Sequence, residues 1–464
     1  MPRSRANDGA FIPSGAEGPD KLIGLDYQCE CGRRHRIEVR HVEVGADILR
    51  NLLPALRKLK LTGRFALVFD KNIRPLAEQH LFPVLDYPGI NYDIVCFDKP
   101  GELHGTVETS DELRALVPKD AKFLMVMGSG TMNDLTKWAA TALDIPYVVI
   151  ATAPSMNGYT SSISALSVAG FKTTQNIRPA AAVFADVNIL KDAPIEMIRA
   201  GLGDLLSKNV CNADWRLSHL LRGTYFCGVP QQMTRRQEDY YLSHAAELGA
   251  RDPAAVQMLT EAIMNSGFSM AIVGESSPSS GSEHLIAHYW EMMDDLAGQP
   301  TELHGARVGV GTLIAADLYE RALKMTPADV DLARAKQNHK SADELRALVD
   351  RFYGAVAGKT FEETVKKAVP WDEKEKQLAT LRDNWAGVWA DVKQYLRPRA
   401  EIERYMTAAG CPVRARDLKV SRLDTYNAIS YARLMRNRYT ILDVADDLGW
   451  LEGWADELAD EFAG

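Results

Sequence analysis

The sequence predicts two domains, an α/β domain built on a parallel sheet and then an all-helical domain. From about residue 45, apolar runs of strand length alternate with helical segments, as in a parallel sheet with helices on both faces. After about residue 195 helical patterns continue to the last residue. The chain of 464 residues, 46% of them hydrophobic, is long enough for two cores. We therefore assign 1–44 to an extension, 45–195 to the α/β domain and 196–464 to the helical domain.

Composition narrows the class of partner. The net charge of −8 and the absence of a long basic run argue against nucleic acid or an anionic membrane. Six scattered cysteines do not suggest a disulfide framework, and no apolar run approaches the length of a membrane span. A cytoplasmic protein that acts on a small molecule is the expectation.

The extension combines a loose tail, residues 1 to about 20, with a segment rich in cysteine and histidine. Cys29, Cys31, His35 and His41 fall close together. A zinc knuckle is one interpretation, but the two cysteines are separated by one residue only and no second pair follows. Charges that alternate with Ile and Val favour an exposed hairpin.

The α/β domain is expected to begin with helices and strands in alternation. In such a domain, ligands bind beyond the carboxyl ends of the strands. The expected helices are 47–61, 73–81 and the stretch after Gly130, and the expected strands are 64–70, 92–98, 121–127, 145–151 and parts of 163–186.

A glycine-rich turn joins the strand that ends near Gly128 to the following helix. Glycines let a phosphate approach the backbone, where unpaired amides and the helix dipole hold its charge. The structural alternative is an ordinary turn capped by Thr131.

Two other strand ends are predicted to line the same cofactor site. Asp70 is placed to bind a cofactor ribose or to terminate its strand in a turn, and the polar loop 152–162 is expected to face the ligand crevice.

Asp204, His284 and His304 are the candidate metal ligands of the helical domain. One carboxylate and two imidazoles with a vacant position suit a catalytic divalent cation. Although His284 and His288 stand four residues apart, Glu283 precedes the pair rather than lying inside it, which excludes the metalloprotease pattern. Each histidine taken singly also suits an ordinary core or surface position, and Asp204 suits a helix cap.

Several motifs together resemble the bacterial type of sn-glycerol-1-phosphate dehydrogenase, over roughly residues 45 to 450. That family belongs to the iron-containing alcohol dehydrogenase and dehydroquinate synthase superfamily. The resemblance implies a nucleotide-binding α/β domain followed by a helical metal domain. The motifs are Gly128-Ser-Gly-Thr-Met-Asn-Asp, Thr152-Ala-Pro-Ser-Met-Asn-Gly-Tyr-Thr-Ser, Gly201-Leu-Gly-Asp-Leu-Leu-Ser-Lys, Gly281-Ser-Glu-His, Leu303-His-Gly and Arg438-Tyr-Thr-Ile-Leu-Asp.

The resemblance also implies site residues. Nickel or zinc would be held by Asp204, His284 and His304, and His288 would face the substrate. At Asn157 this chain departs from the aspartate of the family, at a position that resembles a substrate contact. The implied contacts of NAD or NADP are Asp70, Gly130, Thr131, Met132, Asn133, Asp134, Thr152, Ala153, Pro154, Ser155 and Ser161.

The implied reaction is the reversible reduction of dihydroxyacetone phosphate to sn-glycerol 1-phosphate by NAD(P)H, with Asp204, His288 and Asn157 as catalytic residues in a homodimer. Lys172 and Lys208 are candidate phosphate partners, or solvated surface charges. Asp70 favours NAD, although Lys71 or Arg74 nearby would suit NADP. The alternatives are a reductase of another phosphorylated ketone or polyol, a lyase of the dehydroquinate synthase kind, and a noncatalytic nucleotide-binding protein.

Overall fold

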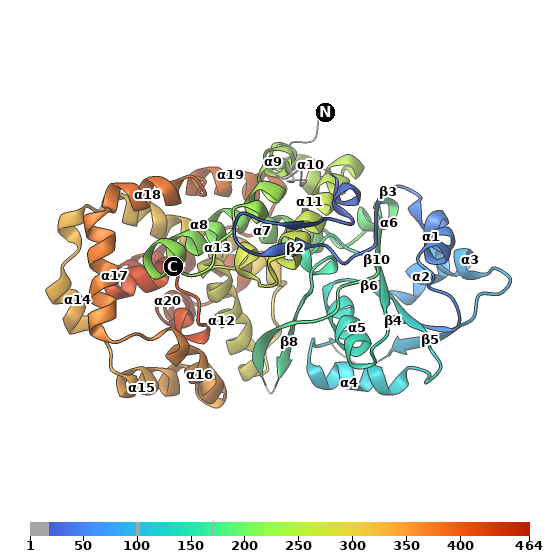
Figure 1. Ribbon diagram of the computed structural model, residues 1–464, viewed down its shortest axis with the longest axis horizontal. Coiled ribbons are helices and arrows are strands. Elements are labelled where there is room, and N and C mark those ends of the chain that lie inside the picture. Colours follow the sequence, from blue (N-terminus) through green and yellow to red (C-terminus); the bar gives the residue numbers. More distant parts are fainter. Residues whose placement is uncertain (1–17, 99–102, 169) are drawn as a thin grey trace. The chain divides into compact units, whose positions relative to one another are not determined.

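The computed structural model describes residues 18–98, 103–168 and 170–464, so most of the predicted N-terminal tail lies outside the described residues. The chain forms two compact units (Figure 1). The first unit contains the described residues up to Val168, together with Lys172–Gly201 and Cys227–Ser276. The second consists mainly of Leu202–Phe226 and Ser277–Gly464. The single boundary near residue 195 stays a prediction. The division into compact units leaves that boundary close to Gly201 but adds three later helices, within Cys227–Ser276, to the first unit.

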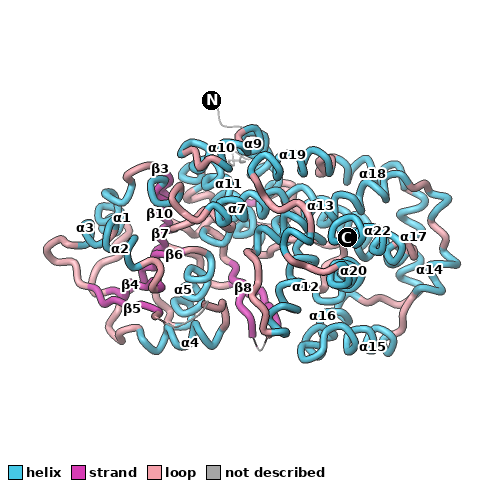
Figure 2. Tube along the Cα trace, turned by 180° about the vertical axis from the view of Figure 1, so that it is seen from behind, coloured by secondary structure: helices cyan, strands magenta, loops and turns pink. Residues whose placement is uncertain are grey.

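The first unit is organised on a six-stranded parallel sheet (Figure 2). The strand order is β3-β10-β7-β6-β4-β5. This sheet and the helical second unit confirm the predicted fold class. The strands are β3 (His41–Gly45), β4 (Phe65–Asp70), β5 (Tyr92–Phe97), β6 (Phe123–Gly128), β7 (Tyr147–Ala151) and β10 (Ala182–Asp186).

Successive side chains of the central strands point to opposite faces of the sheet. Phe65, Leu67 and Phe69 of β4 pack into a core with residues of the helices that precede and follow the strand. The opposite face is covered by the helix that follows β6. Burial on both faces explains why these strands appear in the sequence as nearly continuous apolar runs.

Two small hairpins accompany the sheet. The first pairs β1 (Asp26–Gln28) with β2 (Arg34–Arg36) and lies within the predicted cysteine-rich hairpin. The prediction extended that hairpin to His41, but His41 begins β3, which pairs in parallel with β10 at the edge of the sheet. The second hairpin joins β8 (Ile163–Val168) to β9 (Phe171–Asn176).

The helices of the first unit alternate with its strands as predicted, and a further group of helices from later in the sequence joins them. After α7 (Ile195–Leu206), in which the chain passes to the second unit, α9 to α11 return to the first. The first unit contains α1 (Leu52–Lys58), α2 (Arg74–His80), α3 (Phe82–Leu85), α4 (Val107–Leu116), α5 (Gly130–Ala142), α6 (Val187–Leu190), α9 (Val229–Ser243), α10 (Ala245–Gly249) and α11 (Pro253–Val273).

The second unit is helical apart from its connecting segments. Among the described residues, no helix is both long and apolar enough to cross a membrane. Its helices are α8 (Lys208–Arg222), α12 (Ser282–Ala297), α13 (His304–Lys324), α14 (Leu332–Asn338), α15 (Ala342–Tyr353), α16 (Ala357–Lys367), α17 (Trp371–Asp383), α18 (Trp385–Lys393), α19 (Arg399–Ala409), α20 (Arg422–Tyr431), α21 (Ile441–Asp447) and α22 (Leu451–Ala463).

Candidate metal and cofactor sites

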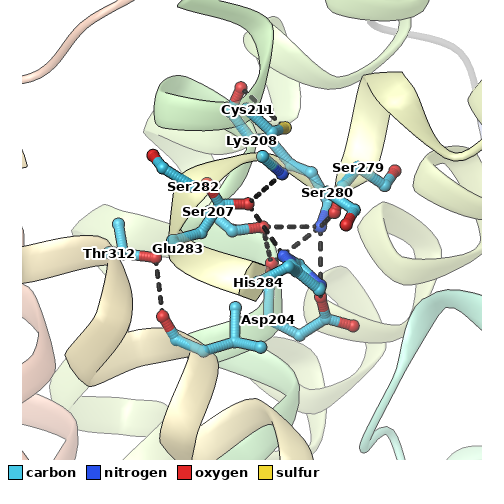
Figure 3. A network of polar contacts seen from close by, with 12 residues as sticks. Asp204, Ser207, Lys208, Cys211, Ser279, Ser280, Ser282, Glu283, His284 and Thr312 are labelled. Carbon is cyan, nitrogen blue, oxygen red and sulfur yellow. Dashed lines mark hydrogen bonds and ion pairs between the residues drawn. The ribbon is translucent and has the colours of Figure 1, made fainter. Parts of the chain in front are cut away.

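The three predicted metal ligands converge inside the second unit. Asp204 lies on α7, His284 near the start of α12, and His304 is the first residue of α13. One donor atom from each lies within 4.8 Å of the others. Asp204 and His284 are 1% and 5% exposed, so these two donors are almost removed from solvent, whereas the side chain of His304 is 33% exposed. Figure 3 shows the side chains of Asp204 and His284 pointing toward each other, with Lys208 beside them.

Two glutamates fix the orientation of the ligand histidines. His284 Nδ1 donates to Glu283 Oε1 at 2.7 Å, and His304 Nδ1 donates to Glu291 Oε1 at 2.6 Å. These hydrogen bonds place the proton on Nδ1 and leave the Nε2 lone pair for a cation. The Nε2 atom of His284 lies 3.6 Å from Asp204 Oδ1.

The charges of the site suit cation binding. Burial opposes ionisation of the Asp204 carboxyl, but the neighbouring Lys208, His284 and His304 outweigh it and lower its pKa. Burial, aided by His304, also holds the pKa of His284 well below its ordinary value. An ionised carboxylate and a neutral imidazole are the protonation states in which these groups bind metals.

Glycines bring the ligand-bearing segments close together. A Cβ atom on Gly203 would overlap the carbonyl oxygen of Gly305 and stand 3.4 Å from the Cα of Gly309. Gly203 precedes Asp204 and Gly305 follows His304, so the close approach of α7 and α13 lies beside two of the ligands. A Cβ on Gly311 would likewise stand 2.5 Å from the carbonyl oxygen of Glu283.

The start of α12 is anchored by a buried carboxylate. Asp214 Oδ2 accepts from the backbone N–H of Ser282 at 2.7 Å and from its hydroxyl at 2.6 Å, and Oδ1 accepts from Tyr319 and from the N–H of Ile441. Burial raises the pKa of Asp214 to about 7. These bonds fix the turn that presents His284.

His288 lies beside the three ligands. Its ring centroid is 5.7 Å from that of His284 and 5.3 Å from that of His304. Donor atoms of His288, Glu291 and His304 also lie within 4.8 Å of one another. His288 is 8% exposed. It therefore belongs to the same side-chain cluster, and its role toward the substrate stays a prediction.

The donor set fits a divalent cation. One carboxylate oxygen and two imidazole nitrogens form an incomplete shell, which leaves positions for water or substrate, as catalytic sites require. Such a mixed oxygen and nitrogen set binds several transition metals.

Glu283 and Glu291 were missed by the sequence analysis as orienting residues. His284, His288 and Glu291 stand at positions i, i+4 and i+7 of one helix, which places them on one face. That spacing was a usable signal for Glu291. The pairing of Glu291 with His304 was not, because it joins two helices.

We expect Glu291→Gln to weaken metal binding by roughly 10- to 100-fold, the usual effect of losing a carboxylate that orients a ligand histidine. The substitution keeps the volume but replaces the charged acceptor of the His304 Nδ1 proton. Metal affinity measured by competition with a chromogenic chelator tests this. Glu373→Gln, the same change at the start of α17, is the control, and equal affinities in both variants would contradict the orienting role.

The predicted cofactor turn lies at the switch point of the sheet. From β4 the chain moves to β5 on one side, and then returns to β6 on the other side of β4. Ligand crevices of open parallel sheets form where the strand order reverses in this way. Asp70 ends β4, and Gly128 ends the adjacent β6. Ser129, rather than Thr131, stands at the N-cap of α5, which argues against the capping alternative.

The other predicted cofactor residues follow the same strand ends. Gly130, Thr131 and Asp134 are half-buried, whereas Met132 and Asn133 are buried in the packing of α5. The loop Thr152–Ser155 follows β7, next to β6, and the backbone N–H of Thr152 donates to the carbonyl of Gly128 at 3.2 Å. The two loops thus lie side by side at the carboxyl edge of the sheet.

Two of the predicted cofactor residues have clear structural roles. Asp70 Oδ1 accepts from the backbone N–H of Asn72 at 2.7 Å and of Ile73 at 3.3 Å. These bonds close the turn after β4, as in the alternative interpretation of Asp70 as a strand-terminating residue. Ser161 is 1% exposed, and its hydroxyl donates to the carbonyl of Ile163 at 2.9 Å. Their contacts with a cofactor stay predictions.

A buried lysine supports the polar loop that follows β7, residues 152–162. Lys137 is fully buried, and its ammonium group donates to the carbonyls of Gly158 at 2.7 Å and Ile163 at 2.8 Å. Burial lowers its pKa. Asn157 lies in the same loop, where its Nδ2 donates to Ser266 Oγ at 3.4 Å.

Of the two candidate phosphate partners, Lys208 is not a solvated surface charge. Its Nζ lies 3.1 Å from Asp204 Oδ1 and donates to Ser207 Oγ at 2.8 Å. It balances the charge of a predicted metal ligand. The side chain of Lys172 is outside the described part of the structure.

Comparisons with known proteins show the family of the chain. A family model described as iron-containing alcohol dehydrogenase matches residues 43–194. The glycerol-1-phosphate dehydrogenase [NAD(P)+] of Geobacillus stearothermophilus is 33% identical over 343 residues, covering 70% of this chain and 84% of that protein. The protein of the same name from Bacillus licheniformis is 27% identical over 427 residues, covering 92% of this chain and 93% of the relative.

Solved structures agree in fold. A probable glycerol dehydrogenase from Sinorhizobium meliloti aligns with a TM-score of 0.58 at 15% identity, over 90% of this chain and 98% of that one. The glycerol dehydrogenase of Schizosaccharomyces pombe gives 0.56 at 15% identity over 91% of each chain. From its relatives, its fold and the arrangement of its motifs, the chain belongs to the glycerol-1-phosphate dehydrogenase family of iron-containing alcohol dehydrogenase-like proteins.

Proposed function

We propose that the protein reduces dihydroxyacetone phosphate to sn-glycerol 1-phosphate, reversibly, with NAD(P)H and one divalent metal ion. The observation that carries this proposal is the convergence of Asp204, His284 and His304, of which the first two are buried, with a glutamate hydrogen-bonded to each histidine. The names of the relatives support the choice of reaction.

The residues divide the chemistry between them. When bound, a divalent cation polarises the ketone oxygen and the reduced nicotinamide supplies hydride to the carbonyl carbon. Asp204, His284 and His304 would hold the cation. His288, whose ring lies beside two of these residues, donates the proton that completes the new hydroxyl group. The burial of Asp204 and His284 limits access of water to the reacting carbonyl.

The finer assignments belong to the same proposal. Nickel and zinc both suit the donor set. NAD is favoured over NADP, because Asp70 at the end of β4 would repel a 2′-phosphate. We further propose a cytoplasmic homodimer that binds a small phosphorylated substrate, with neither nucleic acid nor membrane as a partner.

An NADH oxidation assay with dihydroxyacetone phosphate tests the function. We expect repeated turnover, with one NADH consumed for each sn-glycerol 1-phosphate formed. A lyase of the dehydroquinate synthase kind would consume no NADH in net terms and would release phosphate. Binding of NADH without turnover on any ketone would favour a noncatalytic nucleotide-binding protein and would contradict the proposal.

Asn157 favours a second candidate function, the reduction of a different phosphorylated ketone or polyol. An aspartate accepts hydrogen bonds from substrate hydroxyls, whereas asparagine offers one acceptor and one donor group. A substrate with a carbonyl or carboxylate at this point would therefore suit Asn157 better.

We expect Asn157→Asp to retain or improve kcat/KM for dihydroxyacetone phosphate. The change restores the residue of the family at equal volume, and Ser266 can donate its hydroxyl proton to the new carboxylate. If the true substrate presents an acceptor here, the same change should cost about 2 to 3 kcal/mol in kcat/KM through an unpaired or repelled group. Both proteins should be measured on dihydroxyacetone phosphate and on a panel of phosphorylated ketones. A strong loss on every active substrate, with no gain on dihydroxyacetone phosphate, would contradict the choice of substrate but not the type of reaction.

We expect Gly130→Val to lower NADH affinity more than tenfold, or by over about 1.4 kcal/mol. A Cβ on Gly130 would stand 3.0 Å from Met156 Cγ. A branched side chain would therefore fill space at the start of α5, where the backbone must approach the pyrophosphate. Fluorescence titration with NADH measures the effect, with unchanged metal content as the control. Unaltered affinity would return the turn to a purely structural role.

A further inference from the structure

A second group of possible metal ligands lies in the first unit, apart from the residues of the proposed reaction. It consists of Cys29, Cys31, His35 and Cys227. The first three belong to the β1–β2 hairpin, and Cys227 comes just before α9. We propose that these four residues bind one structural zinc ion.

The turn of the hairpin gathers the first three donors. The backbone N–H of Cys29 donates to the carbonyl of Arg33 at 2.9 Å, and the N–H of Gly32 donates to the carbonyl of Cys29 at 3.0 Å. Gly32 has a φ of +87°, in the left-handed region that glycine adopts readily. This tight turn places Cys31 Sγ 3.4 Å from His35 Nε2.

The distances among the donors fit a shared ion. Cys29 Sγ and Cys227 Sγ are 3.9 Å apart, and His35 Nε2 lies 3.3 Å from Cys227 Sγ. Tetrahedral zinc, with bonds of about 2.3 Å to sulfur and about 2.0 Å to nitrogen, separates two sulfurs by about 3.8 Å and a sulfur from a nitrogen by about 3.5 Å. A disulfide would instead require about 2.05 Å between the sulfurs.

The histidine is oriented as a metal ligand. His35 Nδ1 lies 2.8 Å from the carbonyl oxygen of Ile272, which can only accept a hydrogen bond. The proton is therefore on Nδ1, and Nε2 directs its lone pair toward the sulfurs. His35 is 0% exposed and Cys227 is 2% exposed, while Cys29 and Cys31 are half-buried. The site thus has both an enclosed side and a route for the ion to enter.

Three thiolates and one imidazole complete a tetrahedral shell and leave no position for a substrate, which is the mark of a structural zinc site. The ion would join the hairpin to the start of α9. His35 and Arg33, which donates to the carbonyl of Val273 at 3.2 Å, extend the attachment to the end of α11. A hairpin with strands of three residues is marginal on its own, so a cross-link of this kind accounts for its fixed position.

Cobalt substitution tests the proposal without any mutation. Full-length protein, stripped of metal and reloaded with Co²⁺, should show the strong near-ultraviolet absorption of thiolate-to-cobalt charge transfer. Asp204, His284 and His304 contain no sulfur and cannot produce it. Addition of p-hydroxymercuribenzoate to the zinc-loaded protein should release one zinc ion per chain, detected with a chromogenic chelator.

Variants then assign the ion to its ligands. His304→Ala should keep one zinc ion per chain by elemental analysis, whereas His304→Ala combined with Cys31→Ser should lose it. Cys96→Ser in the same background is the matched control and should keep the zinc. Absence of the charge-transfer band, equal zinc in the Cys31→Ser and Cys96→Ser proteins, or a thiol titration under denaturing conditions that reveals a disulfide would each overturn the proposal.

Discussion

His304→Ala should remove both the bound catalytic metal and turnover, while the fold and NADH binding persist. The imidazole supplies one of three protein donors, and Glu291 would lose the group that it orients. Polarisation of a carbonyl by a metal is worth several kcal/mol, and each 1.36 kcal/mol is tenfold in rate, so we expect kcat/KM to fall by about a thousandfold or more.

The measurement combines elemental analysis, NADH titration and steady-state kinetics on the same preparation. NADH affinity serves as the control, because the predicted cofactor turn belongs to the first compact unit and His304 to the second. Full activity in a variant that has no metal at the Asp204 site would contradict the assignment of a catalytic cation to this site.

The parts of the fold that depend on local pattern were predictable. Strands β4, β6, β7 and β10 are apolar runs because both of their faces are buried, and turn residues separate them from helices. The edge strand β3 was missed as part of the sheet. Its sequence, His41-Val-Glu-Val-Gly, alternates as an exposed strand does, and its neighbour β10 lies about 140 residues later in the chain, as the parallel register of Val42 with Val183 shows.

The candidate sites were likewise predictable in part. Asp204, His284 and His304 were candidates because of their donor types, and the family resemblance then implied that they hold one metal ion. The residues that orient the ligands or complete the sites could not be predicted, because they come from elements far away in the sequence. Glu291 reaches His304 from another helix, and Cys227 reaches His35 across 192 positions, so the apparently missing fourth ligand of the hairpin could not be found from local spacing.

Gly203→Ala is expected to cost metal binding and stability together. The added Cβ would overlap the carbonyl oxygen of Gly305, so α7 and α13 must separate at the residues next to Asp204 and His304. Backbone atoms cannot turn aside as a flexible side chain does. Overpacking of this kind costs about 1 to 3 kcal/mol of unfolding free energy.

The displacement acts directly on the distance between two ligands, so metal affinity should fall by at least about tenfold, the lower end of what loss of a supporting partner costs. Gly453→Ala is the matched control, because it makes the same change within α22, where a Cβ would meet nothing within 4 Å. Alanine there should be neutral or stabilising by up to about 1 kcal/mol, since it lowers the entropy of the unfolded chain. Chemical denaturation and chelator competition on both variants separate the two effects. If Gly203→Ala matched Gly453→Ala in metal affinity and in unfolding free energy, the close approach of α7 and α13 would not be what sets the geometry of the site.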